Sequence, residues 1–296
     1  AINENAAGLK ASNGNADAGP AGGPEAILPP VVGETDYQLI TDIADLESWI
    51  DAARKQGFVA IDTETSSLDA ARAQLVGVAM AIAAGRACYI PLRHVGQGKG
   101  PTDAAPQGGL DFSAPDPEAA DAEPPLQQID FEAAIERLRD LFADPSVLKI
   151  GHNLKYDLTI LETVGLLPQC QLADTMLISY VLDAAAGRHD MDSLAKRLLG
   201  VETTSYEDVC GKGAKQIRFD EVALESASHY ASEDADITLR LYNQFVERLD
   251  QVPSLQSISQ ELELPVMQIL REMENHGALL DVDILNAQSV ILGLRL

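Results

Sequence analysis

The chain has 296 residues, 46% of them hydrophobic, and a formal net charge of −25. The length and the hydrophobic content predict a folded body with a sizeable core, in one large domain or two small ones. The charge argues against a protein that binds duplex DNA through a broad basic face, so any contact with nucleic acid must be local. The 3 cysteines lack Cys-x-x-Cys spacing, which predicts ordinary thiols in a reducing cytoplasm rather than disulfides or structural zinc.

Residues 1–35 are rich in Ala, Gly, Asn and Pro, and predict a flexible linker because they contain few large apolar side chains. No apolar run approaches the length of a membrane span, and the start lacks a signal-peptide pattern. The chain also lacks an initiator Met and stops abruptly at Leu296. We therefore expect a cytoplasmic piece of a longer protein, without a membrane partner.

Short apolar segments predict strands in the first part of the folded region, at residues 37–40, 58–63, 75–83 and 87–91. The turn at residues 84–86 joins the last two strands as a hairpin. After the first strand, Thr41 or Asp42 is suited to cap a helix that has Leu46, Trp49 and Ile50 on its inner face.

Residues 97–128 interrupt this pattern with Gly, Pro, Ala and acidic residues. A stretch of this length predicts a disordered surface insertion, in preference to a lid. Residues 96–100 resemble a phosphate loop only loosely, since they lack the first glycine, a Ser or Thr after Lys99 and a following helix.

The rest of the chain is mainly helical in pattern, with one short strand expected at residues 147–150. Helices are predicted at residues 131–141, 152–164, 173–182, 191–199, 219–249 and 261–274, and from residue 282. We expect the helix at 219–249 to have two segments, the first capped by Asp220 and the second starting near Ser228. A group of strands followed by helices predicts an α/β fold in which helices flank a mixed β-sheet.

Two carboxylates, Asp62 and Glu64, follow directly after the apolar run at residues 58–61. On a strand both project from the same face, where they repel one another unless protons or cations neutralise them. Oxygen ligands at the end of a buried strand favour a hard cation such as Mg²⁺. An Asp-x-Glu pair is weak evidence by itself, so the interpretation depends on partners elsewhere in the chain.

Two later groups of residues can supply these partners. Asn153 and Asp157 share one face of a helix, although an acidic residue also suits the first turn of any helix. Tyr230 and Asp234 lie about 40° apart around a helix and can together position a water and a metal; the alternative is a half-buried Tyr on an amphipathic helix. His229 lies about 140° from Asp234, so we interpret it as a surface residue.

These groups together resemble the 3′–5′ proofreading exonuclease domain of family A DNA polymerases such as bacterial DNA polymerase I. The resemblance rests on the run at residues 187–194 and on three motifs, Asp62-Thr63-Glu64-Thr65, Asn153-Leu154-Lys155-Tyr156-Asp157 and Tyr230-x-x-x-Asp234. It implies an RNase H-like exonuclease fold at residues 36–250, followed at 251–296 by the truncated start of a polymerase domain. The insertion at 97–128 departs from the compact pattern of the family but lies between the motifs.

The resemblance also implies roles for individual residues. Asp62, Glu64 and Asp234 would hold one divalent cation, Asp62 would bridge to a second cation near Asp157, and Tyr230 would orient the attacking water. Mg²⁺ is expected at both positions, with Mn²⁺ or Zn²⁺ as alternatives. Two cations about 4 Å apart can activate a water and stabilise the leaving 3′ oxygen.

The implied substrate is a frayed, single-stranded DNA 3′ end, and the implied partner is a covalently attached polymerase domain in a monomeric protein. Leu68 resembles an apolar wedge against the terminal base, with a plain core leucine as the alternative. Tyr206 resembles an aromatic side chain that stacks on a base. Further contacts with the strand are expected from Thr63, Asn153, Lys155 and Arg188, and from Lys212 or Lys215.

Two other functions stay open at this point. An exonuclease that trims RNA could carry the same site, although the run at 187–194 and the polymerase-like tail favour DNA. A domain that only binds a strand or braces a polymerase could keep the fold. Degenerate relatives of that kind usually lose a carboxylate, and this chain retains all of them, at Asp62, Glu64, Asp157 and Asp234.

Overall fold

The structure is a computed structural model, and it describes residues 35–96, 126–168 and 170–295. The predicted linker up to residue 34 and residues 97–125 of the predicted insertion lie outside the described residues. No helix in the described ranges is both long and apolar enough to cross a membrane.

A mixed sheet, 6-stranded within the described residues, forms the centre of the fold and confirms the predicted class. Its strand order is β1-β4-β3-β2-β5-β6. Strand β3 is antiparallel to both of its neighbours, β2 and β4, whereas the pairs β1–β4, β2–β5 and β5–β6 are parallel. The bounds are β1 (Asp36–Leu39), β2 (Phe58–Thr65), β3 (Leu75–Ala83), β4 (Arg86–Pro91), β5 (Leu148–Gly151) and β6 (Leu172–Asp174).

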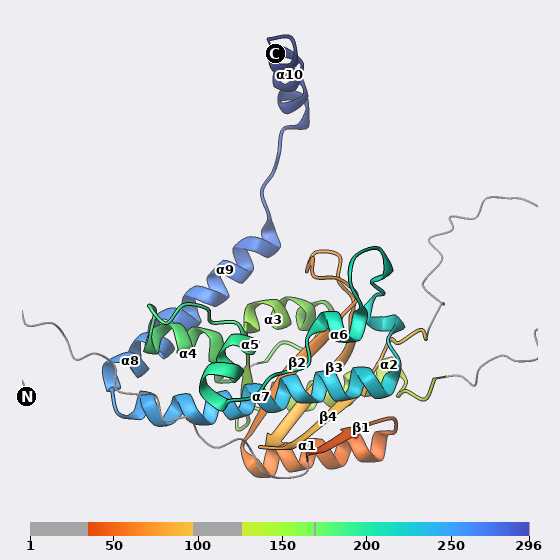
Figure 1. Ribbon diagram of the computed structural model, residues 1–296, viewed down its shortest axis with the longest axis vertical. Helices are drawn as coiled ribbons and strands as arrows, with labels where there is room; N and C mark the ends of the chain where they lie inside the picture. Colours follow the sequence, from red (N-terminus) through yellow and green to blue (C-terminus); the bar gives the residue numbers. More distant parts are fainter. Residues whose placement is uncertain (1–34, 97–125, 169, 296) are drawn as a thin grey trace, which may run out of the picture.

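Helices cover both faces of this sheet (Figure 1). The core on one face includes side chains of α1, α2 and α3, and the core on the other includes side chains of α4, α6 and α7. The helices are α1 (Ile43–Gln56), α2 (Phe131–Ala143), α3 (Leu154–Thr163), α4 (Thr175–Leu182), α5 (Met191–Leu194), α6 (Tyr206–Cys210), α7 (Leu224–Asp250), α8 (Pro253–Ser257), α9 (Leu264–His276) and α10 (Val282–Gly293).

Small side chains bring the long helix α7 close to the sheet. Ala79, Ala81 and Ala87 on the sheet and Ala231 and Ala235 on α7 are all fully buried in one core cluster. The two alanines of α7 are four residues apart and therefore share one face of the helix. Because these alanine side chains are small, α7 can lie close to the sheet, and the polar residues on its flank can reach β2.

Asp236 fixes the rotation of α7 against the sheet. Its fully buried carboxylate accepts hydrogen bonds from the Tyr37 hydroxyl at 2.9 Å and from the Gly85 N–H at 2.7 Å. Asp236 and Asp234 are about 200° apart around the helix, so an anchored Asp236 leaves Asp234 on the side that faces β2.

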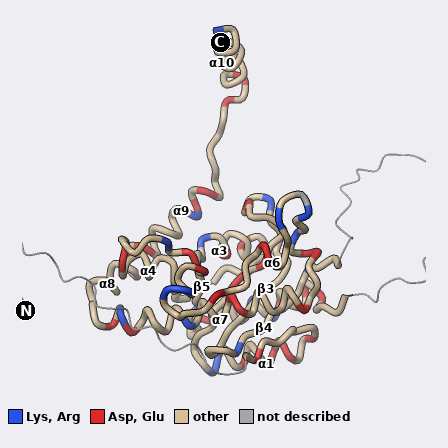
Figure 2. The backbone as a smooth tube through the Cα atoms, in the orientation of Figure 1, with Lys and Arg blue, Asp and Glu red and all other residues tan. Residues whose placement is uncertain are grey.

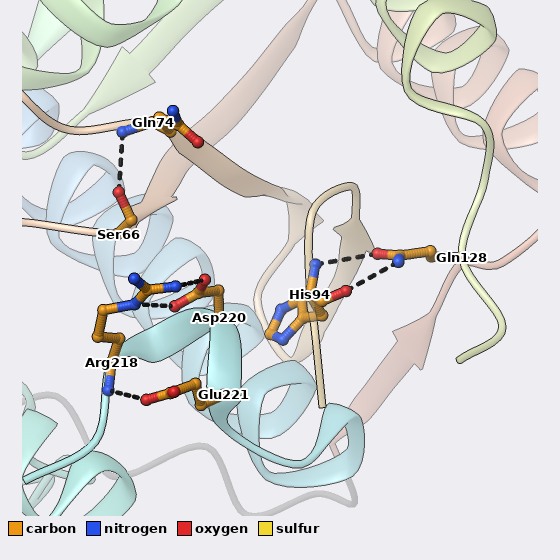
Figure 3. A network of polar contacts seen from close by, with 7 residues as sticks. All are labelled: Ser66, Gln74, His94, Gln128, Arg218, Asp220 and Glu221. Carbon is orange, nitrogen blue, oxygen red and sulfur yellow. Dashed lines mark hydrogen bonds and ion pairs between the residues drawn. The ribbon is translucent and has the colours of Figure 1, made fainter. Parts of the chain in front are cut away.

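The predicted break in this helix is wrong. The helix α7 runs without interruption from Leu224 to Asp250, and Ser228 is buried within it. The segment contains no Gly or Pro that would break a helix. Asp220 does not cap it either, because its carboxylate is ion-paired with Arg218 in the short 3₁₀ turn Phe219–Glu221 (Figure 3).

One helix begins later than predicted, and one short helix was not predicted. The helix expected at 173–182 begins at Thr175, because Leu172–Asp174 pairs with β5 as a strand and Asp174 then caps α4. Helix α6 was not predicted. It is five residues long and is stabilised by a capping box between Ser205 and Asp208. A helix this short does not show a periodic apolar pattern in the sequence.

The last residue of the predicted insertion, Gln128, is joined to the segment that follows β4. The Gln128 side chain accepts a hydrogen bond from the His94 N–H at 3.1 Å and donates one to the His94 carbonyl at 3.0 Å. Figure 3 shows the two residues facing one another. The part of the insertion that is described is therefore tied to the end of β4.

Two helices after α7 differ in how they pack against the body of the protein. Helix α9 packs against α3, and Met267 is buried in the same core cluster as side chains of α1, α2 and α3. Helix α10 has no buried residue and stands apart from the body in Figure 1. The expectation that residues 251–296 begin a polymerase domain stays a prediction.

Candidate active site

Three carboxylates meet between β2 and α7. One oxygen each of Asp62, Glu64 and Asp234 lies within 4.8 Å of the others. The pair on β2 projects toward α7, as the strand alternation predicted, and the close packing of α7 brings Asp234 to them. Opposite Glu64 on β3 is Gly77, where a Cβ atom would lie 2.1 Å from the Tyr89 hydroxyl. The glycine therefore makes room for a buried Tyr ring beneath the carboxylates.

The fourth carboxylate, Asp157, is in the first turn of α3. Its Oδ1 accepts hydrogen bonds from the Thr63 N–H at 3.1 Å and from the Thr63 hydroxyl at 2.5 Å. Burial raises the pKa of Asp157 well above its usual range, as does the charge of Asp62, whereas the hydrogen bonds from Thr63 lower it. Thr63 therefore orients this carboxylate and favours its charged form.

The electrostatics of the cluster favour a bound cation. Burial raises the pKa of Asp62 to about 6. The pKa values of Glu64 and Asp234 are raised well above their usual range, first by burial and then by the charge of Asp62. In addition, Glu64 Oε1 is buried and has no hydrogen-bond partner among the described residues. Buried carboxylates are costly unless a proton or a cation neutralises them, and an all-oxygen ligand set suits Mg²⁺ or Mn²⁺.

A cavity of about 170 Å³ opens over the cluster. Its wall includes Leu68, whose side chain is 85% exposed, and the rings of Tyr156, Tyr206 and Tyr230. The alternative that Leu68 is a core residue is therefore wrong. An exposed apolar side chain and aromatic rings beside a carboxylate cluster are suited to hold unpaired bases.

A single buried ring supports two of these tyrosines. Phe219 is fully buried, and its ring centroid lies 5.8 Å from that of Tyr230 and 6.5 Å from that of Tyr206, to which it is nearly parallel. Burial, followed by the charge of Asp234, raises the pKa of Tyr230 far above its usual value. The Tyr230 hydroxyl is therefore neutral at any ordinary pH.

Sequence reasoning missed Tyr156 as part of the site. Its hydroxyl donates to the Ser67 carbonyl at 2.7 Å and lies 2.6 Å from the Thr65 hydroxyl. These contacts tie α3 to the segment that carries Leu68. The available signal was its position, directly before Asp157 in the second motif.

Three of the expected strand contacts do not line the cavity. The backbone of Asn153 is left-handed, with φ 64°, and its N–H donates to Asp174 at 3.2 Å. The Lys155 ammonium pairs with Glu274 at 2.6 Å. The Arg188 guanidinium pairs with Asp190 at 2.8 Å.

Among the remaining expected residues, Thr63 and Tyr206 line the cavity. Lys212 and Lys215 lie between α6 and α7, in one of the basic segments coloured blue in Figure 2. His229 is exposed on α7, as predicted, and its ring contacts Tyr37 edge-on at 5.5 Å.

Comparisons with known proteins identify the family of this chain. Residues 37–250 match the family described as 3′–5′ exonuclease, of the DNA polymerase A type. DNA polymerase I of Pseudomonas aeruginosa is 39% identical over 266 residues, which are 89% of this chain and 26% of that protein. DNA polymerase I of Rhizobium leguminosarum is 41% identical over 262 residues, 86% of this chain and 24% of that protein. The chain thus spans about a quarter of the length of these relatives.

Solved structures share the fold at lower sequence identity. NrnC of Brucella melitensis has a TM-score of 0.54 at 22% identity, over 82% of this chain and 96% of that one. RNase D of Escherichia coli has a TM-score of 0.52 at 20% identity, over 81% of this chain and 51% of that one. These likenesses confirm the RNase H-like exonuclease fold. With the family match and the polymerase relatives, they lead to one assignment: the chain belongs to the 3′–5′ exonuclease family of DNA polymerase A.

Proposed function

We propose that this chain is the metal-dependent 3′–5′ exonuclease that proofreads for a DNA polymerase I, by removing mononucleotides from a frayed DNA 3′ end. The observation that carries the proposal is the convergence of Asp62, Glu64 and Asp234 oxygens within 4.8 Å, beneath a cavity walled by Leu68 and tyrosines. The buried Glu64 Oε1, which has no hydrogen-bond partner in the described part of the chain, supports a cation there.

The carboxylates would hold two divalent cations, for which we propose Mg²⁺. Asp62, Glu64 and Asp234 would bind one, and Asp62 and Asp157 would bind the other. When bound, such ions lower the pKa of a water and neutralise charge on the leaving oxygen. The donor set is negative and made of oxygen atoms, which fits hard cations.

The surrounding side chains would hold the strand and the water. The neutral Tyr230 hydroxyl is suited to orient a water by hydrogen bonding, and its raised pKa makes it a poor general base. Leu68 would separate the terminal base from its neighbour. Tyr206 would stack on a base, a contact that contributes about 1–3 kcal/mol.

The relatives indicate in which larger protein this activity would be found. Because the chain spans about a quarter of proteins named DNA polymerase I, we propose that a polymerase domain follows it in a single chain. The protein would then act in bacterial DNA replication and repair, in the cytoplasm and as a monomer.

Digestion of a 5′-labelled single-stranded DNA oligonucleotide tests the proposal. With Mg²⁺ the wild-type chain should shorten it from the 3′ end, one nucleotide at a time. Asp234→Asn, which removes one charge at constant shape, should abolish the ladder, and Tyr230→Phe should lower the rate by about a hundredfold or more. A folded sample that gives no ladder with Mg²⁺ or Mn²⁺ would refute the proposal. Faster digestion of the matching RNA strand would instead favour an RNA-trimming enzyme.

A further inference from the structure

Helix α9 lies beyond the matched family region, residues 37–250, yet it contacts a helix of the exonuclease site. It packs against α3, the helix that carries Tyr156 and Asp157. Met267 of α9 is only 5% exposed and is part of the core cluster that includes Leu158 and Leu161 of α3. The fold of the exonuclease unit thus continues past residue 250.

Polar contacts join α9 to both ends of α3. Arg271, 6% exposed, donates from Nη1 to Glu162 Oε2 at 2.5 Å, and Asn275 Nδ2 donates to the same oxygen at 2.8 Å. At the other end of α3, the Lys155 ammonium contacts Glu274 Oε1 at 2.6 Å. Contacts at both ends of a ten-residue helix restrain its tilt as well as its position.

The ion pairs at the two ends of α3 differ in strength. Both Lys155 and Glu274 are substantially exposed, and an exposed ion pair contributes little because water screens it. The Arg271 side chain is only 7% exposed, although that of Glu162 is 42% exposed, so water screens this pair from one side only and its loss has a larger effect. Arg271 and Glu162 therefore dominate this junction.

The tilt of α3 bears directly on the site. Asp157 accepts hydrogen bonds from Thr63 at 3.1 and 2.5 Å, and these depend on the position of α3. The Tyr156 hydroxyl, on the same helix, donates to the Ser67 carbonyl at 2.7 Å. On the inner side, Asp174 accepts from the Leu154 N–H at 2.8 Å and fixes the start of α3. The end of α3 has its polar restraint from α9.

We propose that α9 positions α3, and that Arg271 acts through Glu162 as a positioning residue for Asp157 and Tyr156. The expected effect on catalysis rests on the proposed function, because it requires Asp157 to be a metal ligand. This positioning gives the segment that leads toward the proposed polymerase domain a direct mechanical link to the exonuclease site.

The test compares Arg271→Met, Arg271→Lys and wild type in the full 296-residue chain. Arg271→Met keeps the apolar stem and removes the charge. It should lower kcat about tenfold, equivalent to about 1.4 kcal/mol, raise the Mg²⁺ concentration that gives half-maximal rate, and leave KM for single-stranded DNA unchanged. Arg271→Lys should recover most of the activity. Glu272→Gln, at an exposed position of the same helix, is the matched control.

Amide hydrogen exchange provides a second readout that needs neither metal nor activity. In the metal-free protein, Arg271→Met should speed exchange in residues 154–163, and Glu272→Gln should not. If Arg271→Met does not fold, Glu162→Gln removes the same ion pair from the other side and should give the same results.

The inference is overturned if α3 exchange, kcat and Mg²⁺ dependence all stay at wild-type values in the variant that lacks the ion pair. It is equally overturned if Arg271→Lys is as impaired as Arg271→Met. Wild-type protein without nuclease activity, but with the expected change in α3 exchange, would instead refute the proposed function and leave the positioning of α3 in place.

Discussion

Thr63 donates both its backbone N–H and its hydroxyl to the same oxygen of Asp157, at 3.1 and 2.5 Å. Thr63 stands between Asp62 and Glu64 on β2. One short segment of strand therefore supplies two carboxylates of the proposed site and orients a third. The fourth, Asp234, arrives on α7, whose rotation is fixed by the buried Asp236.

Thr63→Val should weaken the site without disturbing the strand. The change removes the hydroxyl donor and keeps the backbone bond, so Asp157 becomes less well oriented and its pKa rises further. Loss of such a supporting hydrogen bond costs about 10- to 100-fold in metal affinity or activity. Titration of the rate against Mg²⁺ measures this, and Thr63→Ser, which keeps a hydroxyl, should stay near wild type. Equal effects of the two substitutions would contradict the role given to the hydroxyl.

Leu68→Ala should impair cleavage but not folding. The Leu68 side chain is 85% exposed at the cavity, so its truncation should change the free energy of unfolding by less than about 0.5 kcal/mol. KM for single-stranded DNA should rise. The matched control is Leu75→Ala on β3, at a fully buried position, which should cost about 2–5 kcal/mol. Urea denaturation and steady-state kinetics separate the two effects, and a large loss of stability in Leu68→Ala would be incompatible with the exposure of the side chain.

The metal-free protein should lose stability as the pH rises. Burial raises the pKa of Asp62 to about 6 from its ordinary value of 3.8, so the folded state holds this proton more tightly than the unfolded chain. Protonated Asp62 therefore contributes fully to the free energy of unfolding below about pH 4. This contribution is lost as the pH rises through the pKa of Asp62 in the folded state. The raised pKa values of Glu64 and Asp234 act in the same direction.

Asp62→Asn, which stays neutral, should therefore gain stability relative to wild type on going from acidic to mildly alkaline pH. Urea unfolding in the presence of EDTA, at about pH 5 and about pH 8, provides the comparison. Saturating Mg²⁺ at the higher pH should stabilise the wild type, because the cation binds only the folded state. A difference between the two proteins that does not vary with pH would argue against buried carboxylates with raised pKa values.

The sequence contains enough local information to locate the carboxylates. The alternation of β2 predicted that Asp62 and Glu64 share a face, and the helical spacing of Tyr230 and Asp234 predicted a shared direction. Both predictions agree with the cavity, which these residues line together. The mixed sheet followed from strand segments that are long or strongly apolar.

Features set by distant contacts could not be predicted in the same way. The ammonium of Lys155, an expected strand contact, pairs with Glu274, which lies 119 residues later in the chain. Strand β6 has only 3 residues and is defined by its pairing with β5. The role of Phe219 depends on rings from other elements, and nothing in its own segment indicates it. Local pattern thus located the carboxylates, whereas tertiary packing determined what holds them in place.

Binding of Mn²⁺, followed by electron paramagnetic resonance, tests the central claim most directly. Wild-type protein at mildly alkaline pH should bind Mn²⁺, and Mg²⁺ should compete for the same site. Asp62→Asn should lose this binding while its circular dichroism spectrum stays that of the folded protein, because Asp62 is the carboxylate that would contact both cations. Undiminished Mn²⁺ binding by a folded Asp62→Asn protein would contradict the assignment of this cluster as the metal centre.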